Sequence, residues 1–147
     1  AKELLKDLDI TIRLVGPTML SDVAMNELAS EMEVIGSVPR AEISKHYAWA
    51  DVFVLPTLSE GSANVCYEAM AAGLPVVTTA NAGSVIRDGH DGVLVPIRDG
   101  QALASALEKM ASDREYTARL GAQALATHEG SNFRDYARTL MSAVTET

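Results

Sequence analysis

The chain has 147 residues, of which 48% are hydrophobic and 22% are charged, a balance typical of one globular domain rather than a disordered chain or a membrane protein. A formal net charge of −8, with no run of Lys or Arg, argues against nucleic acid as the main partner. The apolar runs are too short for a transmembrane segment, and a single cysteine leaves no intramolecular disulfide to form. These features favour a cytoplasmic location.

The hydrophobic pattern predicts, in chain order, a strand over 10–15, a helix over 22–32, a strand over 34–36, a helix over 41–50 and a strand over 51–56. It continues with a helix over 64–72, strands over 75–79 and 92–96, and helices from 101 onward, among them 102–112, 116–126 and 133–144. Strands that are apolar on both faces and alternate with helices indicate a parallel sheet covered on both sides. The predicted fold class is α/β, a Rossmann-like doubly wound parallel sheet with a helical C-terminal tail.

The segment LPTLSEGSANVCYEAMAAGLPVV, residues 55–77, joins a predicted strand to the following helix. In doubly wound sheets, ligands bind outside the carboxyl ends of the strands. The first N–H groups of the helix that begins near Asn64 have no partner within the helix, and the dipole is positive there, which favours a phosphate group. Gly61, Ser62 and Ala63 are small enough to let a ligand approach the main chain. The loop is therefore a candidate cradle for a pyrophosphate.

Two glutamates belong to this segment: Glu60 precedes the helix, and Glu68 lies about one turn into it. An ionised carboxylate only accepts hydrogen bonds, so the two donors of a vicinal diol on a ribose or a hexose suit it. A phosphate between two such sugars describes a nucleotide sugar. By spacing alone, Glu60 could equally be a solvated loop charge, and Glu68 a polar residue on the outer face of the helix.

Residues 52–79, VFVLPTLSEGSANVCYEAMAAGLPVVTT, resemble the nucleotide-sugar-binding signature of retaining GT-B glycosyltransferases of the family-four type. Glu60 and Glu68 fit the E-x7-E spacing of that signature, and A-M-A-x-G-x-P-V-V follows as in the family. The similarity extends upstream through IRLVGP and EVIGSVPRAEISKHYAWADV, and downstream through RDGHDGVLVPIRDGQALASALEKMASD. It covers most of the chain.

The resemblance implies a role for each matching residue. It assigns the catalytic position to Glu60, which would position the transferred sugar. It assigns the binding of the ribose hydroxyls of the nucleotide sugar to Glu68. Val65 would direct its N–H toward the diphosphate, the loop of Val38 and Pro39 would meet the nucleobase, and Gly16 would border the same cleft. The substrate-binding residues implied in this way are Glu68, Gly61, Ser62, Ala63, Asn64, Val65, Gly16, Val38 and Pro39.

The implied protein is a retaining glycosyltransferase that transfers a hexose from a UDP- or GDP-sugar to a glycan, lipid or small-molecule acceptor, with neither cofactor nor metal. The family's phosphate-contacting Arg and Lys, in a G-R…K-G segment, have no counterpart here and would precede Ala1. Residues 1–147 are thus expected to form the C-terminal nucleotide-sugar-binding domain without its first strand and helix. An N-terminal acceptor domain would complete it in cis, and this chain alone is expected to be inactive. Peripheral membrane association of the full-length protein stays open.

Other interpretations accompany this one. A nucleotide-sugar epimerase shares the architecture by resemblance, and a non-catalytic nucleotide-sugar-binding module would carry the same loop. A glycosidase also uses two carboxylates, but here both are needed as ionised acceptors. The DGHDG run at 88–92 lacks the spaced oxygens and distal Glu of a calcium loop and is expected to be a turn. Tyr47 and Trp49 are expected to pack rather than to stack on a base.

Overall fold

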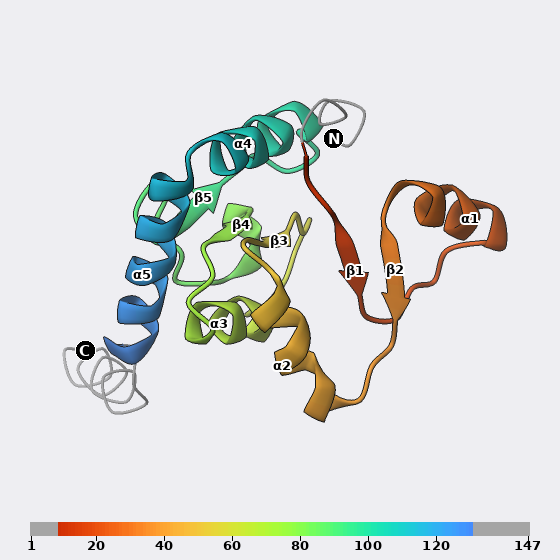
Figure 1. Ribbon diagram of the computed structural model, residues 1–147, viewed down its shortest axis with the longest axis horizontal. Coiled ribbons are helices and arrows are strands. Elements are labelled where there is room, and N and C mark those ends of the chain that lie inside the picture. Colours follow the sequence, from red (N-terminus) through yellow and green to blue (C-terminus); the bar gives the residue numbers. More distant parts are fainter. Residues whose placement is uncertain (1–8, 131–147) are drawn as a thin grey trace, which may run out of the picture.

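The computed structural model describes residues 9–130, in which short parallel strands alternate with helices (Figure 1). The strands are β1 (Arg13–Val15), β2 (Glu33–Gly36), β3 (Phe53–Leu55), β4 (Val76–Thr78) and β5 (Gly92–Leu94). The α-helices are α1 (Asp22–Glu31), α2 (Arg40–Trp49), α3 (Asn64–Ala71), α4 (Gly100–Ser112) and α5 (Arg114–Gly130), and a 3-10 turn, η2, spans Ala80–Ala82. The predicted helix over 133–144 lies outside the described residues.

The strands pair in two groups. β1 pairs with β2, and β4 lies between β3 and β5, with every pairing parallel. Val77 of β4 is opposite Val54 on one side and Val93 on the other, so β4 has partners on both edges and all three of its residues are buried. Among the described residues, β1, β2, β3 and β5 each keep one edge without a strand partner.

Helices cover both faces of the β3–β4–β5 sheet, as a doubly wound fold requires. Because side chains alternate along a strand, Val76 packs in one core cluster with Cys66 and Met70 of α3, whereas Val77 packs in a second cluster with Met110 and Leu120. Figure 1 shows α3 on one side of these strands and α4 on the other. The α/β, Rossmann-like prediction is confirmed.

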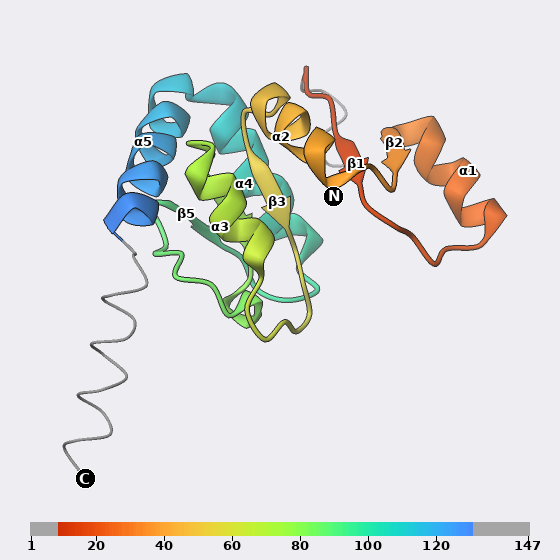
Figure 2. The ribbon, with the colours of Figure 1, turned by 90° about the horizontal axis from the view of Figure 1, so that it is seen from below.

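The β1–α1–β2 segment forms a more open part of the molecule. None of the α1 residues is buried, and Figure 2 shows α1 at the end of the molecule away from α5. The Arg13 guanidinium stacks 3.7 Å from the centre of the Trp49 ring and pairs with Glu33 at 2.7 Å. Trp49 is itself 44% exposed and belongs to neither core cluster of the sheet, so its contact with Arg13 links β1 to α2 at the surface.

The helix ends follow local chemistry. Asp99 caps α4 by accepting a hydrogen bond from the N–H of Ala102 at 2.9 Å, and Ser21 caps α1 in the same way. No side chain caps α2 or α3. Among the described residues, no helix is both long enough and apolar enough to cross a bilayer.

Candidate functional site

The loop between β3 and α3 ends at an uncapped helix start. Ala63 occupies the N-cap position of α3 and offers no side-chain oxygen, while Asn64 and Val65 are exposed at the first positions of the helix. In the first turn of α3, the N–H of Cys66 donates to the carbonyl of Ala63 at 2.9 Å, whereas the N–H groups of Asn64 and Val65 come too early in the helix to reach an acceptor within it and lie at the positive end of its dipole. This end of α3 has the chemistry of an anion-binding site.

The loop is held in place by the segment that follows β4. The N–H of Glu60 donates to the carbonyl of Asn81 at 2.9 Å, and the N–H of Ala63 donates to that of Ala82 at 3.0 Å. The Asn81 side-chain amide also donates to the carbonyl of Leu58 at 2.8 Å. These bonds fix the main chain of the loop and leave the Glu60 side chain exposed to solvent.

Gly83 allows this segment to approach the loop. Its φ of +60° is one that side chains rarely adopt, and a Cβ there would overlap the carbonyl of Gly61. A glycine at this position is needed both for the backbone conformation and for the close packing of the segment after β4 against the loop that contains Gly61.

Between α2 and α3 lies a depression of about 550 Å³ that runs along α3 from Val65 in its first turn to Ala71 at its end, and its volume is in the range of small-ligand sites. Three of the residues that the family resemblance assigned to substrate binding, Val38, Val65 and Glu68, lie together in its wall. The other lining residues were not predicted from the sequence, and they are Arg40, Ile43, Ser44, Tyr47 and Ala71.

The remaining predicted site residues do not line this depression. Glu60, Gly61, Ser62 and Ala63 belong to the neighbouring loop, and Asn64 is the first residue of α3; Ala63 is buried and the other four are exposed. Pro39 occupies the N-cap position of α2. Gly16, with φ +129°, donates its N–H to the carbonyl of Gly36 at 2.9 Å, so it lies where β1 and β2 end.

Tyr47 makes the most informative contact in the depression. Its hydroxyl donates to Oε2 of Glu68 at 3.0 Å and lies 3.4 Å from the carbonyl oxygen of Val65. Its ring packs against Phe53 with ring centroids 5.9 Å apart, so the packing predicted for Tyr47 is confirmed. Burial, and the hydrogen bond to the neighbouring Glu68 carboxylate, raise the pKa of Tyr47 above its usual value, so the hydroxyl keeps its proton at neutral pH.

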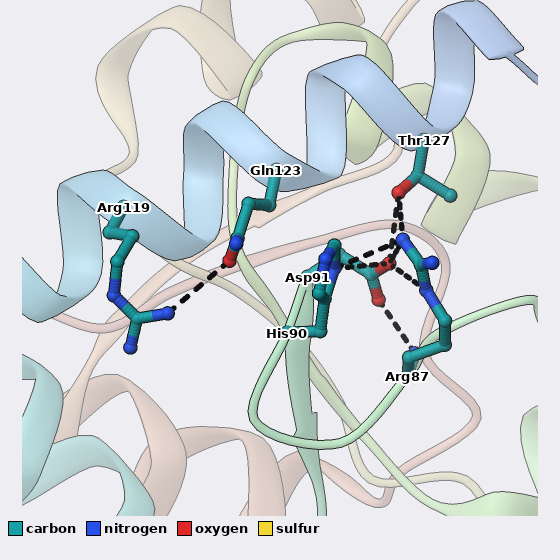
Figure 3. Close-up of polar contacts among 6 residues, drawn as sticks. All are labelled: Arg87, His90, Asp91, Arg119, Gln123 and Thr127. Atoms are coloured by element: carbon teal, nitrogen blue, oxygen red, sulfur yellow. Dashed lines mark hydrogen bonds and ion pairs between the residues drawn. The ribbon is translucent and has the colours of Figure 1, made fainter.

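The DGHDG run forms the predicted turn before β5, and it carries a buried charge that the pattern did not reveal. The Asp91 side chain is fully buried and accepts hydrogen bonds from the N–H and Nε of Arg87, at 2.6 and 2.8 Å, and from Thr127 of α5 at 3.0 Å (Figure 3). These polar groups satisfy one another, which indicates a structural connection between the turn and α5. Within residues 9–130, no group of three or more His, Cys, Asp or Glu side chains is arranged to hold a metal ion.

Several known proteins are similar to this chain. A D-inositol 3-phosphate glycosyltransferase of Thermobifida fusca (strain YX) is 32% identical over 130 residues, which cover 86% of this chain and 30% of that protein. The C-terminal domain of a glycosyl transferase group 1 family protein, LpcC, from Francisella tularensis superposes with a TM-score of 0.75 at 24% identity, over 84% of this chain and 71% of that one. HepE of Anabaena, crystallised with UDP, gives a TM-score of 0.77 at 24% identity, over 95% of this chain and 43% of HepE.

At these identities the structural likeness concerns the fold, which is that of GT-B glycosyltransferases. The chain spans about a third of the length of the Thermobifida fusca relative. A family model described as glycosyl transferases group 1 matches residues 1–113, which is most of the sequence. The chain therefore belongs to the glycosyl transferases group 1 family.

Proposed function

We propose that this chain is the donor-binding domain of a retaining, metal-independent glycosyltransferase that transfers a hexose from a UDP- or GDP-sugar to a glycan, lipid or small-molecule acceptor. One observation carries the proposal. Val38, Val65 and Glu68, which the family resemblance assigned to one ligand, line a single depression that runs along α3 from its uncapped first turn. Val65 and Glu68 lie three residues apart on one face of α3, whereas Val38 belongs to the segment between β2 and α2, so the meeting of Val38 with the other two follows from the fold.

In this arrangement, different residues suit different parts of the nucleotide sugar. The N–H groups at the start of α3 suit the diphosphate, whose negative charge grows as the sugar leaves, and such preorganised donors favour the transition state. Glu68, on the depression side of α3, suits the hydroxyls of the ribose. Glu60, on the exposed loop, suits the hydroxyls of the transferred hexose, because an ionised carboxylate accepts from both donors of a diol.

The relatives support the same class of donor. HepE of Anabaena was crystallised with UDP and also with UDP-glucose, and the Thermobifida fusca relative is named a glycosyltransferase. Because the chain spans about a third of that relative, we propose that a second domain in the complete protein binds the acceptor. Closure of the two domains would exclude water from the reacting bond.

Calorimetric titration tests the proposal, with UDP, GDP and their glucose and mannose conjugates as the ligands. Glu68→Ala removes hydrogen bonds to a charged group and should weaken nucleotide and conjugate alike by about tenfold or more. Glu60→Ala should weaken only the conjugates. Glu108→Ala, on the exposed face of α4, is the matched control and should change neither.

Absence of binding to every nucleotide and conjugate would contradict the donor-site proposal for this chain. Unchanged affinities in Glu68→Ala would contradict the ribose assignment. If Glu60→Ala weakened free UDP or GDP as much as their conjugates, the assignment of Glu60 to the hexose would be wrong.

A further inference from the structure

We infer that Tyr47 is a positioning residue that orients the Glu68 carboxylate toward the ribose hydroxyls of the nucleotide. The inference rests on the proposed function, because it concerns how the same site holds its donor. Tyr47 is on α2 and Glu68 is on α3, so the contact exists only because these two helices flank one depression.

The contact leaves the carboxylate able to bind a ligand. An ionised carboxylate has two oxygens with about four lone-pair sites in all, and the Tyr47 hydroxyl takes one site on Oε2. Oε1 and the remaining site on Oε2 stay available for two hydroxyl donors. A vicinal diol can therefore bind while the hydrogen bond from Tyr47 stays in place.

The tyrosine is itself well held, which makes it an effective support. Its ring packs against Phe53 of β3 at an interplanar angle of 51°, and a ring on two torsions is stiffer than a glutamate side chain. Fixing a flexible side chain before the ligand arrives removes part of the entropy cost of binding. Without the hydroxyl, the Glu68 carboxylate would sample rotamers that cannot meet both ribose hydroxyls.

The hydroxyl also joins two parts of the proposed donor site. It lies 3.4 Å from the carbonyl oxygen of Val65, which belongs to the first turn of α3. Tyr47 is thus placed to hold the ribose-binding carboxylate at a constant position relative to the proposed diphosphate site. Because Tyr47 stays protonated at neutral pH, its hydroxyl can donate a hydrogen bond to Glu68 and adds no negative charge to the site.

The test removes the hydroxyl from the protein and, separately, the hydroxyls from the ligand. Tyr47→Phe keeps the ring and its packing on Phe53, so the fold is retained, which thermal unfolding verifies. Affinities of the unaltered chain and the variant are measured by calorimetry for UDP and GDP and for their 2′,3′-dideoxy analogues. Tyr47→Phe should weaken the ribonucleotide that binds by about tenfold and leave its dideoxy analogue nearly unchanged.

Two further variants separate the possible explanations. Tyr116→Phe, on α5, loses a tyrosine hydroxyl outside the depression and should change no affinity. In a Glu68→Ala background, Tyr47→Phe should have no further effect, because the carboxylate that it orients is gone.

Each outcome is decisive. An equal loss for the ribonucleotide and its dideoxy analogue would mean that Tyr47 acts only through general structure, and would overturn the inference. If Glu68→Ala weakens the ribonucleotide and Tyr47→Phe does not, the inference fails while the proposed function stands. If the unaltered chain binds neither nucleotide, the proposed function fails and the inference fails with it.

Discussion

Replacing the buried Asp91 by Asn should destabilise the domain by removing the charge around which the turn before β5 is built. The side chain is 0% exposed, and its two oxygens accept from the main-chain and side-chain nitrogens of Arg87 and from the hydroxyl of Thr127 (Figure 3). An asparagine keeps the shape but has one oxygen instead of two. Its NH2 group would face the hydrogen-bond donors of Arg87 or Thr127. At least one hydrogen bond is therefore lost, and two donors are left facing each other.

The structure sets the size of the effect. Breaking a buried ion pair by removing one partner costs about 3–5 kcal/mol, but the Arg87 side chain is 56% exposed and regains water when Asp91 loses its charge. Hydrogen bonds to charged groups contribute about 1.5–3 kcal/mol each. We therefore expect Asp91→Asn to lower the free energy of unfolding by about 2–3 kcal/mol at pH 7.

The effect should also depend on pH. Burial by itself would raise the pKa of Asp91, but the hydrogen bonds from Arg87 and Thr127 outweigh it and hold the pKa below its usual value. A carboxyl whose folded-state pKa is lowered stabilises the fold above its unfolded-state pKa, about 3.9, and loses that contribution as the pH falls through the folded-state value. The difference between the native chain and Asp91→Asn should therefore shrink below about pH 4.

Urea unfolding followed by circular dichroism at pH 7 and at pH 3 measures both quantities. Asp88→Asn is the matched control, since Asp88 is an exposed carboxyl in the same turn that accepts from the N–H of Leu94 at 2.9 Å, and it should cost about 1 kcal/mol or less. A loss no larger in Asp91→Asn than in Asp88→Asn would refute the reasoning. So would a loss that is the same at both pH values.

Two other substitutions test how the loop and the helices are held. Gly83→Ala and Gly89→Ala both place a side chain at positive φ, which by itself should cost about 1–2 kcal/mol of unfolding free energy. Gly83→Ala should cost more than Gly89→Ala, because only its Cβ also displaces the carbonyl of Gly61. Nucleotide affinity should therefore fall in Gly83→Ala alone, and an equal fall in both would contradict this account of the loop. Asp99→Ala removes the cap that accepts from the N–H of Ala102 and should cost about 1 kcal/mol in urea unfolding, whereas an unchanged midpoint would show that solvent replaces the cap.

The sequence by itself determined the order of the elements and the position of the loop that carries Glu60 and the start of α3. Strand and helix periods are local properties, and an apolar strand followed by small residues and a helix specifies where main-chain donors will lie. Glu60 and Glu68 stand at the two ends of the E-x7-E spacing, eight positions apart, and the structure places Glu68 within α3. These features needed no knowledge of distant contacts.

Only the tertiary structure decided which side chains meet. Tyr47 reaches Glu68 across 21 residues, and Thr127 reaches Asp91 across 36, and neither pair leaves a periodic signal in the sequence. The polar run DGHDG gave no sign that one of its carboxylates is fully buried. Hydrogen-bond partners between elements depend on how helices pack on a sheet, which the sum of many non-local contacts sets, so the partners of Glu68 and Asp91 became visible only in the folded chain.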